Sequence, residues 1–228
     1  MGDGRLFSKK LDKWVRTAHH RRVMAHSIHF NCQIHQAARE VAQAKVASTR
    51  TYALSRFYDL TAERLVRFAA TITRRQHDAE DAVATVMLKV ASRPELLMRA
   101  DQPWHYLLRM VRNESLVVVR GRSRISSIGA MAERLMGRSV DVVEKDDERQ
   151  VIWQALESLP DDQREVIVLK VWEQLTFAEI GEVLELSPST AASRYRYGLE
   201  KLTQKLERSL GVHYASSVVE SGRSEAVS

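Results

Sequence analysis

The 228-residue chain carries a net charge of +6 and contains only 9 glycines and 4 prolines. So few turn-forming residues argue against β-sandwiches, barrels and collagen-like repeats, which need frequent turns or regularly placed glycines. The 44% hydrophobic content excludes global disorder, and no uninterrupted apolar run approaches the ~18 residues of a membrane span. The composition predicts an all-α protein without membrane insertion.

The N-terminal sequence and the cysteine content predict a cytoplasmic location. Residues 11–22 are basic and polar, so the apolar segment of a signal peptide is missing. The single cysteine, Cys32, has no partner for an internal disulfide, which favours a reducing compartment.

Charge is distributed unevenly along the chain. Residues 1–125 carry 23 Lys and Arg against 11 Asp and Glu, whereas residues 126–228 carry 12 against 18. This asymmetry favours a polyanionic partner for the N-terminal half. A solvated basic surface is the alternative interpretation.

Residues 1–47 form a basic N-terminal extension. His26, His29, Cys32 and His35 recur in it every third residue, a spacing that suggests metal ligands. In a helix each such step rotates the side chain by about −60°, so only an adjacent pair would share an ion. We therefore expect no metal site, and no cofactor. A basic helix that supports binding of a nucleic acid or a protein partner is the preferred interpretation, together with a poorly ordered or misassigned start.

Amphipathic helices are predicted next. Apolar residues recur at mostly three- and four-residue steps over residues 48–73, which indicates one amphipathic helix or a helix pair. Asp78 fits the N-cap of a second helix, which ends before Pro94. A third helix has Pro103 in its first turn and runs to about Arg120.

The helical periodicity is lost over residues 125–148, which contain serines, glycines and an acidic run. We predict a linker there, with a short helix around residues 130–136. Helices resume at residues 149–210, where Asp162 and Glu165 fit a capping box.

Two capped helices follow with a three-residue turn between them. Thr176 and Glu179 fit a capping box, and Ser187 with Pro188 supplies an N-cap and a first-turn proline. A short helix, a short turn and a longer capped helix are typical of a helix-turn-helix, whose second helix enters the major groove of DNA.

The outer face of that second helix is polar and basic. It carries Arg194, Lys201 and Lys205 and no carboxylate, which suits contacts to phosphate and guanine. A solvated face of a terminal bundle helix is the alternative. The predicted DNA-binding residues are Ser189, Thr190, Ser193, Arg194, Arg196, Tyr197 and Lys201.

These motifs resemble an extracytoplasmic-function sigma factor of bacterial RNA polymerase. TFAEIGEVL at residues 176–184 resembles the first helix of the family's helix-turn-helix, and SPSTAASRYR at 187–196 its recognition helix. The segment at 156–166 resembles the start of the same domain. DAEDAV at 78–83 resembles the start of the helix that binds the polymerase clamp. PWHYLLRMVRN at 103–113 resembles the helix that engages the minus-ten promoter element.

The resemblance implies two small helical domains on a flexible linker, no enzymatic activity, and promoter opening together with core polymerase. It also implies three partners, namely the clamp of the largest polymerase subunit, promoter DNA and an anti-sigma factor held between the domains. The expected divisions are the extension at 1–47, a region-2-like domain at 48–124, the linker at 125–148, a helix-turn-helix domain at 149–210 and a flexible tail at 211–228.

Promoter opening requires an unstacked base to be held outside the duplex. Aromatic and arginine side chains suit this task, since one base–aromatic stack contributes about 1–3 kcal/mol. The predicted minus-ten and melting residues are Trp104, Tyr106, Arg109, Arg112, Asn113, Arg120 and Arg122. A role in the core is the alternative for Trp104 and Tyr106.

The resemblance also indicates a surface for core polymerase. The predicted residues are Asp78, Glu80, Asp81, Ala84, Thr85 and Leu88. The family usually has a glutamine and an acid at the positions of Ala84 and Thr85, so we expect weaker or differently made polymerase contacts. A stand-alone helix-turn-helix regulator is the competing function, but it has no use for the two upstream motifs. No nucleophile elbow, phosphate-binding glycine loop or HExxH motif supports an enzyme.

Overall fold

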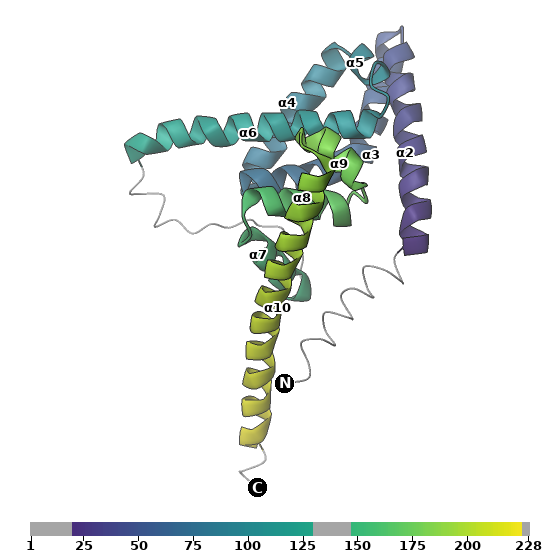
Figure 1. Cartoon of the computed structure of the whole chain (residues 1–228). Helices are drawn as coiled ribbons and strands as arrows, with labels where there is room; N and C mark the ends of the chain where they lie inside the picture. Colours follow the sequence, from purple (N-terminus) through teal and green to yellow (C-terminus); the bar gives the residue numbers. More distant parts are fainter. Residues whose placement is uncertain (1–19, 130–146, 225–228) are drawn as a thin grey trace.

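The computed structural model describes the backbone of residues 20–129 and 147–224 and the side chains of residues 29–122 and 152–206. Helix is the only regular secondary structure in these ranges, which confirms the all-α prediction (Figure 1). We call the first five helices the N-terminal bundle: α2 (His20–Gln43), α3 (Ala47–Thr73), α4 (Gln76–Ser92), α5 (Glu95–Met98) and α6 (Pro103–Gly129). The C-terminal bundle comprises α7 (Asp147–Glu157), α8 (Asp161–Val171), α9 (Phe177–Leu184) and α10 (Pro188–Ser224).

The N-terminal bundle is built around α3, which packs against α2, α4 and α6. Phe57, Leu65 and Phe68 of α3 are fully buried, and Val86 of α4 and Leu107 of α6 belong to the same apolar cluster. Burying a side chain of this size contributes about 1.5–3 kcal/mol. Apolar side chains therefore hold α4 and α6 against α3, and the outer faces of α4 and α6 are left available for other contacts.

Several helix ends differ from the predictions. The N-cap of α4 is Arg75, so Asp78 lies in the first turn, where it forms an ion pair with Arg122. The N-cap of α8 is Pro160, and Glu165 points into the structure instead of capping. Both predicted caps are wrong because each helix begins earlier than expected. The carboxylates of Asp78 and Glu165 instead bind arginines distant in sequence, Arg122 and Arg112.

The two longest helices continue beyond their predicted ends. Helix α6 runs to Gly129, where we expected its end near Arg120, and α10 runs to Ser224 through most of the predicted tail. No proline interrupts either extension. The short helix predicted at residues 130–136 lies outside the described residues. Every helix in the part of the chain that the structure describes is too short or too polar to span a membrane.

The helix-turn-helix agrees with the prediction. The Thr176 hydroxyl accepts from the Glu179 backbone N–H at 3.3 Å, and the Glu179 carboxylate accepts from the Thr176 N–H at 2.6 Å, which confirms the capping box. At the start of α10 the Ser187 hydroxyl accepts from the Thr190 N–H at 3.1 Å. The turn between the two helices brings the carbonyl of Leu186 against Gly181, where a Cβ atom would lie only 2.6 Å from that oxygen.

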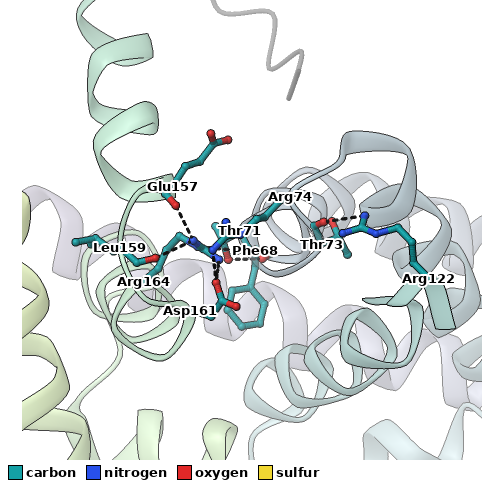
Figure 2. A network of polar contacts seen from close by, with 9 residues as sticks. All are labelled: Phe68, Thr71, Thr73, Arg74, Arg122, Glu157, Leu159, Asp161 and Arg164. Carbon is teal, nitrogen blue, oxygen red and sulfur yellow. Dashed lines mark hydrogen bonds and ion pairs between the residues drawn. The ribbon is translucent and has the colours of Figure 1, made fainter. Parts of the chain in front are cut away.

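The two bundles pack against each other, with α8 on α3 and α9 on α6. Figure 2 shows the central polar contact. The guanidinium of Arg164 is completely buried and donates from Nε to the Thr71 carbonyl at the end of α3, at 2.7 Å. It also donates to the carbonyls of Glu157 and Leu159 and to the Asp161 carboxylate. One arginine thus ties α3 to the α7–α8 turn.

We predict that Gly181→Ala lowers the free energy of unfolding by about 1–3 kcal/mol, because the new methyl group collides with a backbone oxygen that cannot turn away. Gly121→Ala is the matched control. No atom lies within 4 Å of a Cβ there, and alanine favours helix, so a gain of about 0.5–1 kcal/mol is expected. Urea unfolding followed by circular dichroism measures both. Equal effects of the two substitutions would contradict this account.

Candidate nucleic-acid interface

The N-terminal half of α10 presents the predicted polar face to solvent. The buried side of the helix carries Ala191 and Leu202. The exposed side carries six of the seven predicted DNA-binding residues, namely Ser189, Thr190, Ser193, Arg196, Tyr197 and Lys201. The predicted phase of the helix is therefore confirmed.

The two arginines of this face have different environments. Nε of Arg194 lies 3.3 Å from a carboxylate oxygen of Asp162 on α8, so Arg194 is half-buried within its own bundle. The guanidinium of Arg196 lies 4.9 Å from the ring centroid of Tyr197, and one of its nitrogens donates to the tyrosine hydroxyl at 3.2 Å. Arg194 thus lies beside a carboxylate of its own bundle, whereas Arg196 and Tyr197 form an exposed pair.

The outer face of α4 forms a second exposed surface. Glu80, Asp81, Ala84 and Leu88 are exposed on it, and Leu88 is 72% exposed. Thr85 and Asp78 are half-buried. A cleft of about 570 Å³ lies beside this face, between α3 and α4, and is closed on one side by Trp153 of α7. Acidic side chains next to an exposed leucine suit a protein partner with basic and apolar side chains.

The predicted minus-ten residues of α6 are not equally accessible. Asn113 and Arg120 are exposed, and Tyr106 and Arg109 are half-buried with the guanidinium 5.6 Å from the ring centroid. Tyr106 and Arg109 line a cleft of about 550 Å³ that Glu182 of α9 also borders. Nη1 of Arg122 lies 2.7 Å from the Asp78 carboxylate, so this pair connects α6 to α4.

Trp104 lies in the core between the bundles. It is only 2% exposed, and its ring meets the Phe30 ring edge-on at 5.0 Å. Its indole N–H donates to a carboxylate oxygen of Glu173, in the loop between α8 and α9, at 3.2 Å. Arg64 of α3 donates to the same oxygen at 2.6 and 3.1 Å. In this conformation the Trp104 ring is not available to a base.

Arg112 and His105 of α6 also face carboxylates of the C-terminal bundle. Nε of Arg112 donates to buried Glu165 of α8 at 2.6 Å. The imidazole of His105 is 5% exposed, with its nitrogens 3.7 Å from Glu179 and 3.5 Å from Glu182 of α9. Among the described residues neither imidazole nitrogen has a hydrogen-bond partner.

Burial changes the acidity of the carboxylates in this contact. Burial raises the pKa of Glu173 and of Glu165, and the attraction of Arg64 and Arg112 only partly opposes this. Burial also disfavours ionisation of Asp161, but the hydrogen bond from Arg74 and the charge of Arg164 together hold the pKa of Asp161 below its usual 3.8.

Sequence reasoning missed the contact between the bundles. Arg64, Glu173 and His105 were not among the predicted site residues, and Glu165 was interpreted as a cap. One feature of the sequence points to this contact: the N-terminal half of the chain is net basic and the C-terminal half is net acidic. At the N-terminal end, Cys32 is exposed on the helix α2, and no group of three or more metal-ligating side chains lies close together in the described residues.

Comparison with known proteins gives two family matches in chain order. Residues 57–125 match the model of Sigma-70 region 2, and residues 149–202 match that of Sigma-70 region 4.

The regions that match curated relatives cover most of the length of each relative. The ECF RNA polymerase sigma factor SigK of Mycobacterium ulcerans is 29% identical over 171 residues, which cover 72% of this chain and 91% of the relative. SigK of Mycolicibacterium vanbaalenii is 29% identical over 170 residues, covering 71% and 86%. The RNA polymerase sigma-E factor of Streptomyces avermitilis is 28% identical over 144 residues, covering 63% and 79%.

A solved structure shares the fold. It is the sigma factor RpoE in complex with the anti-sigma factor NepR from Bartonella quintana, with a TM-score of 0.57 and 22% identity. The similarity covers 67% of this chain and 96% of that chain.

The raised pKa values of Glu165 and Glu173 predict a pH dependence of stability. A carboxyl whose pKa is higher in the folded than in the unfolded chain contributes stability that is complete below its usual pKa of 4.5 and is lost as the pH rises through the raised value. Lowering the pH from about 8 to about 5 should therefore increase the free energy of unfolding through these two groups. Asp161 has the opposite effect on stability, because its pKa is lower in the folded chain. The stability that it contributes is lost only as the pH falls below 3.8.

Urea unfolding across this range tests the prediction. Glu165→Gln with Glu173→Gln should give a flatter pH profile than the unmodified chain. The control, Glu185→Gln with Glu200→Gln, removes two exposed carboxylates and should leave the profile unchanged. A profile that is the same for the unmodified chain and the buried-pair variant would refute the assignment.

Proposed function

We infer the function of this chain from its family, because the chain belongs to the extracytoplasmic-function sigma factors of bacterial RNA polymerase. It binds core RNA polymerase, recognises promoter DNA and promotes strand opening in transcription initiation. One observation carries this conclusion, which is the pair of ordered matches to Sigma-70 region 2 and region 4 on one chain. A stand-alone helix-turn-helix regulator would explain only the second match, so we do not favour it.

We propose that residues 48–124 form the domain that binds core polymerase and the minus-ten element, and that residues 149–210 form the domain that binds the minus-thirty-five element. Residues 125–148 then connect the two domains. This division is supported by the packing of α3 against α4 and α6 and of α10 against α8 and α9, while one apolar core continues from the first group of helices into the second.

We propose that α10 enters the major groove of the minus-thirty-five element. Its six exposed polar residues support this role. Arg194, which lies beside Asp162 near the start of α10, is proposed to read a base, because the N-terminal residues of a recognition helix contact base edges. Lys201 lies about two turns further along α10, where contacts to backbone phosphate are expected.

We propose that the outer face of α4 binds the clamp of the largest polymerase subunit. Glu80, Asp81, Ala84 and Leu88 are exposed there, and Trp153 of α7 borders the adjoining cleft. Asp78 contributes by fixing Arg122, and Thr85 lies at the edge of the same face.

The proposed minus-ten surface is divided by the contact between the bundles. Tyr106, Arg109, Asn113 and Arg120 are at least partly accessible and can meet the unpaired strand. Trp104 and Arg112 are covered, as is part of the surface around His105. Full engagement of the minus-ten element therefore requires the bundles to separate.

The remaining proposals follow from the family. We propose that the chain has no catalytic activity of its own and acts in the cytoplasm, where core polymerase works. We also propose an anti-sigma partner, since the neighbouring RpoE structure contains the anti-sigma factor NepR.

Run-off transcription with purified core polymerase tests the function directly. The chain should comigrate with core and start transcription on some promoters of a genomic pool; failure of both would refute the function. Leu88→Asp should weaken core binding by about tenfold or more, because it removes an apolar contact worth up to about 1.5–3 kcal/mol. Val117→Asp changes a 55% exposed valine on α6 and should leave core binding unchanged.

Substitutions on α10 separate base reading from phosphate binding. Arg194→Ala should cost about 1–3 kcal/mol and relax specificity at one position of the minus-thirty-five element. Lys201→Ala should weaken binding uniformly across sequences and reduce the slope of log K against log salt by about 1. Binding of holoenzyme to a library of minus-thirty-five variants at several salt concentrations measures both. Uniform weakening by Arg194→Ala would assign Arg194 to phosphate instead.

A further inference from the structure

We propose that Arg64 and Trp104 form a binding site for one backbone phosphate of the promoter strand, in the position that the Glu173 carboxylate takes in this structure. The inference deepens the proposed function and rests on it, because it assumes that the N-terminal bundle meets the minus-ten element. Phosphate binding is a new role for both side chains. Arg64 is not among the predicted minus-ten residues, and Trp104 is predicted there only for stacking on a base.

Three donors of the N-terminal bundle converge on one anionic oxygen. Oε2 of Glu173 accepts from Nη2 and Nε of Arg64, at 2.6 and 3.1 Å, and from the indole N–H of Trp104 at 3.2 Å. The forked N–H groups of a guanidinium match the geometry of carboxylate and phosphate oxygens. Since an indole N–H donates and never accepts, an anion is the ligand that satisfies all three donors at once.

The N-terminal bundle builds this site without help from the other bundle. The Arg64 guanidinium of α3 lies 3.6 Å from the ring centroid of Phe30 on α2 and 5.1 Å from that of Trp104 on α6. The two rings meet edge-on at 5.0 Å. None of these contacts involves Glu173, so the donors keep their places when another anion replaces that carboxylate.

The site gives helix α2 a role in promoter binding. Residues 20–43 of α2 precede the match to Sigma-70 region 2, which begins at residue 57. The helix packs against α3 and α6 (Figure 1), and its buried Phe30 covers the guanidinium of Arg64, whose side chain is only 20% exposed. Partial exclusion of water strengthens a charge-assisted hydrogen bond. Phe30 therefore acts as a positioning residue for the phosphate site.

The electrostatics of the site favour a phosphate over a carboxylate. Burial raises the pKa of Glu173, although the charges of Arg64 and Arg67 and the hydrogen bonds from Arg64 and Trp104 oppose this effect. A buried carboxylate can lose its charge by binding a proton, whereas each phosphodiester of DNA carries a full negative charge at neutral pH. The three donors thus hold a phosphate in its ionised form without that competing reaction.

The site lies next to the accessible part of the minus-ten surface. Tyr106 and Arg109 follow Trp104 on α6 and are partly accessible. A strand whose bases meet these two side chains can place a neighbouring phosphate at Trp104 and Arg64. In the closed arrangement, in which the two bundles are packed together, Glu173 from the loop between α8 and α9 fills this position instead.

The first test locates the phosphate in the promoter complex. Forked promoter DNA is synthesised with one neutral methylphosphonate at a time along its unpaired minus-ten strand, and binding of holoenzyme is measured. With the unmodified chain, one position should weaken binding by about tenfold, because a hydrogen bond to a charged group is lost. With Arg64→Gln the same position should have no effect. Each protein is compared with its own binding to unmodified DNA, so general changes in affinity cancel.

Two further variants make this test specific. Arg56→Gln removes the same charge from an exposed position of α3, where Arg56 pairs with Glu40, and should keep the tenfold effect. Trp104→Phe retains an aromatic ring without the N–H and should reduce the effect, whereas a role in stacking alone would leave it unchanged and overturn the part assigned to the indole. Methylphosphonate effects that are the same in the unmodified chain and in Arg64→Gln at every position would overturn the proposal.

The second test needs no polymerase and uses inorganic phosphate as the probe. Glu173→Ala vacates the site in the full chain, which is labelled with ¹⁵N-tryptophan and observed by NMR. Phosphate should shift the Trp104 indole N–H resonance of Glu173→Ala, and the shift should be absent in Glu173→Ala with Arg64→Gln. Trp104→Phe identifies the resonance by its loss. No shift in Glu173→Ala, or equal shifts in both variants, would overturn the site.

Far-UV circular dichroism verifies that each variant is folded. If Glu173→Ala loses helix, phosphate should restore it, because an anion that binds only the folded chain stabilises that chain. The same phosphate concentration should not restore Glu173→Ala with Arg64→Gln, and equal rescue of both would also contradict the proposal. Run-off transcription by the unmodified chain reports on the proposed function separately, so a failure of that function and a failure of the phosphate site are distinguishable.

Discussion

The arrangement of the two bundles depends on the buried guanidinium of Arg164. A charged group without solvent costs several kcal/mol unless each of its donors is satisfied, and the donors of Arg164 reach acceptors on both sides of the contact (Figure 2). Its Nε reaches the Thr71 carbonyl of the N-terminal bundle, and its other nitrogens reach Glu157, Leu159 and Asp161 of the C-terminal bundle. When the bundles separate, Nε of Arg164 must donate to water instead, and the Thr71 carbonyl at the end of α3 loses its hydrogen bond.

From this anchor the remaining contacts follow along α8. The next residue after Arg164 is Glu165, whose carboxylate reaches Arg112, and the end of α8 delivers Glu173 to Trp104. The loop there places Gln174 in the left-handed region, with φ of 59°, which turns the chain back after Glu173. A set of polar contacts that begins at α3 thus ends on the residues proposed to open promoters. In the proposed function the same side chains, once released, meet the promoter.

Local features of the sequence predicted the helices and their exposed faces. The Thr176 capping box and the phase of α10 depend on residues within a few turns of one another, whereas the outer face of α4 follows from the family resemblance. The contact between the bundles depends on pairs separated by 53 residues for Arg112 and Glu165 and 69 for Trp104 and Glu173. No periodicity encodes such pairs. The capping-box pattern at Glu165 is misleading for the same reason: Arg112, which binds Glu165, lies on another helix.

The state of the Trp104 indole tests the central claim most directly. Hydrogen exchange of its N–H can be followed by NMR on a chain labelled with ¹⁵N-tryptophan. The closed arrangement predicts slow exchange in the free chain, because the indole is buried and donates to Glu173, and faster exchange in Glu173→Lys, which removes the acceptor and places a second cation beside Arg64. Exchange in the free, unmodified chain at the rate of an exposed indole would contradict the claim that the C-terminal bundle covers the minus-ten surface.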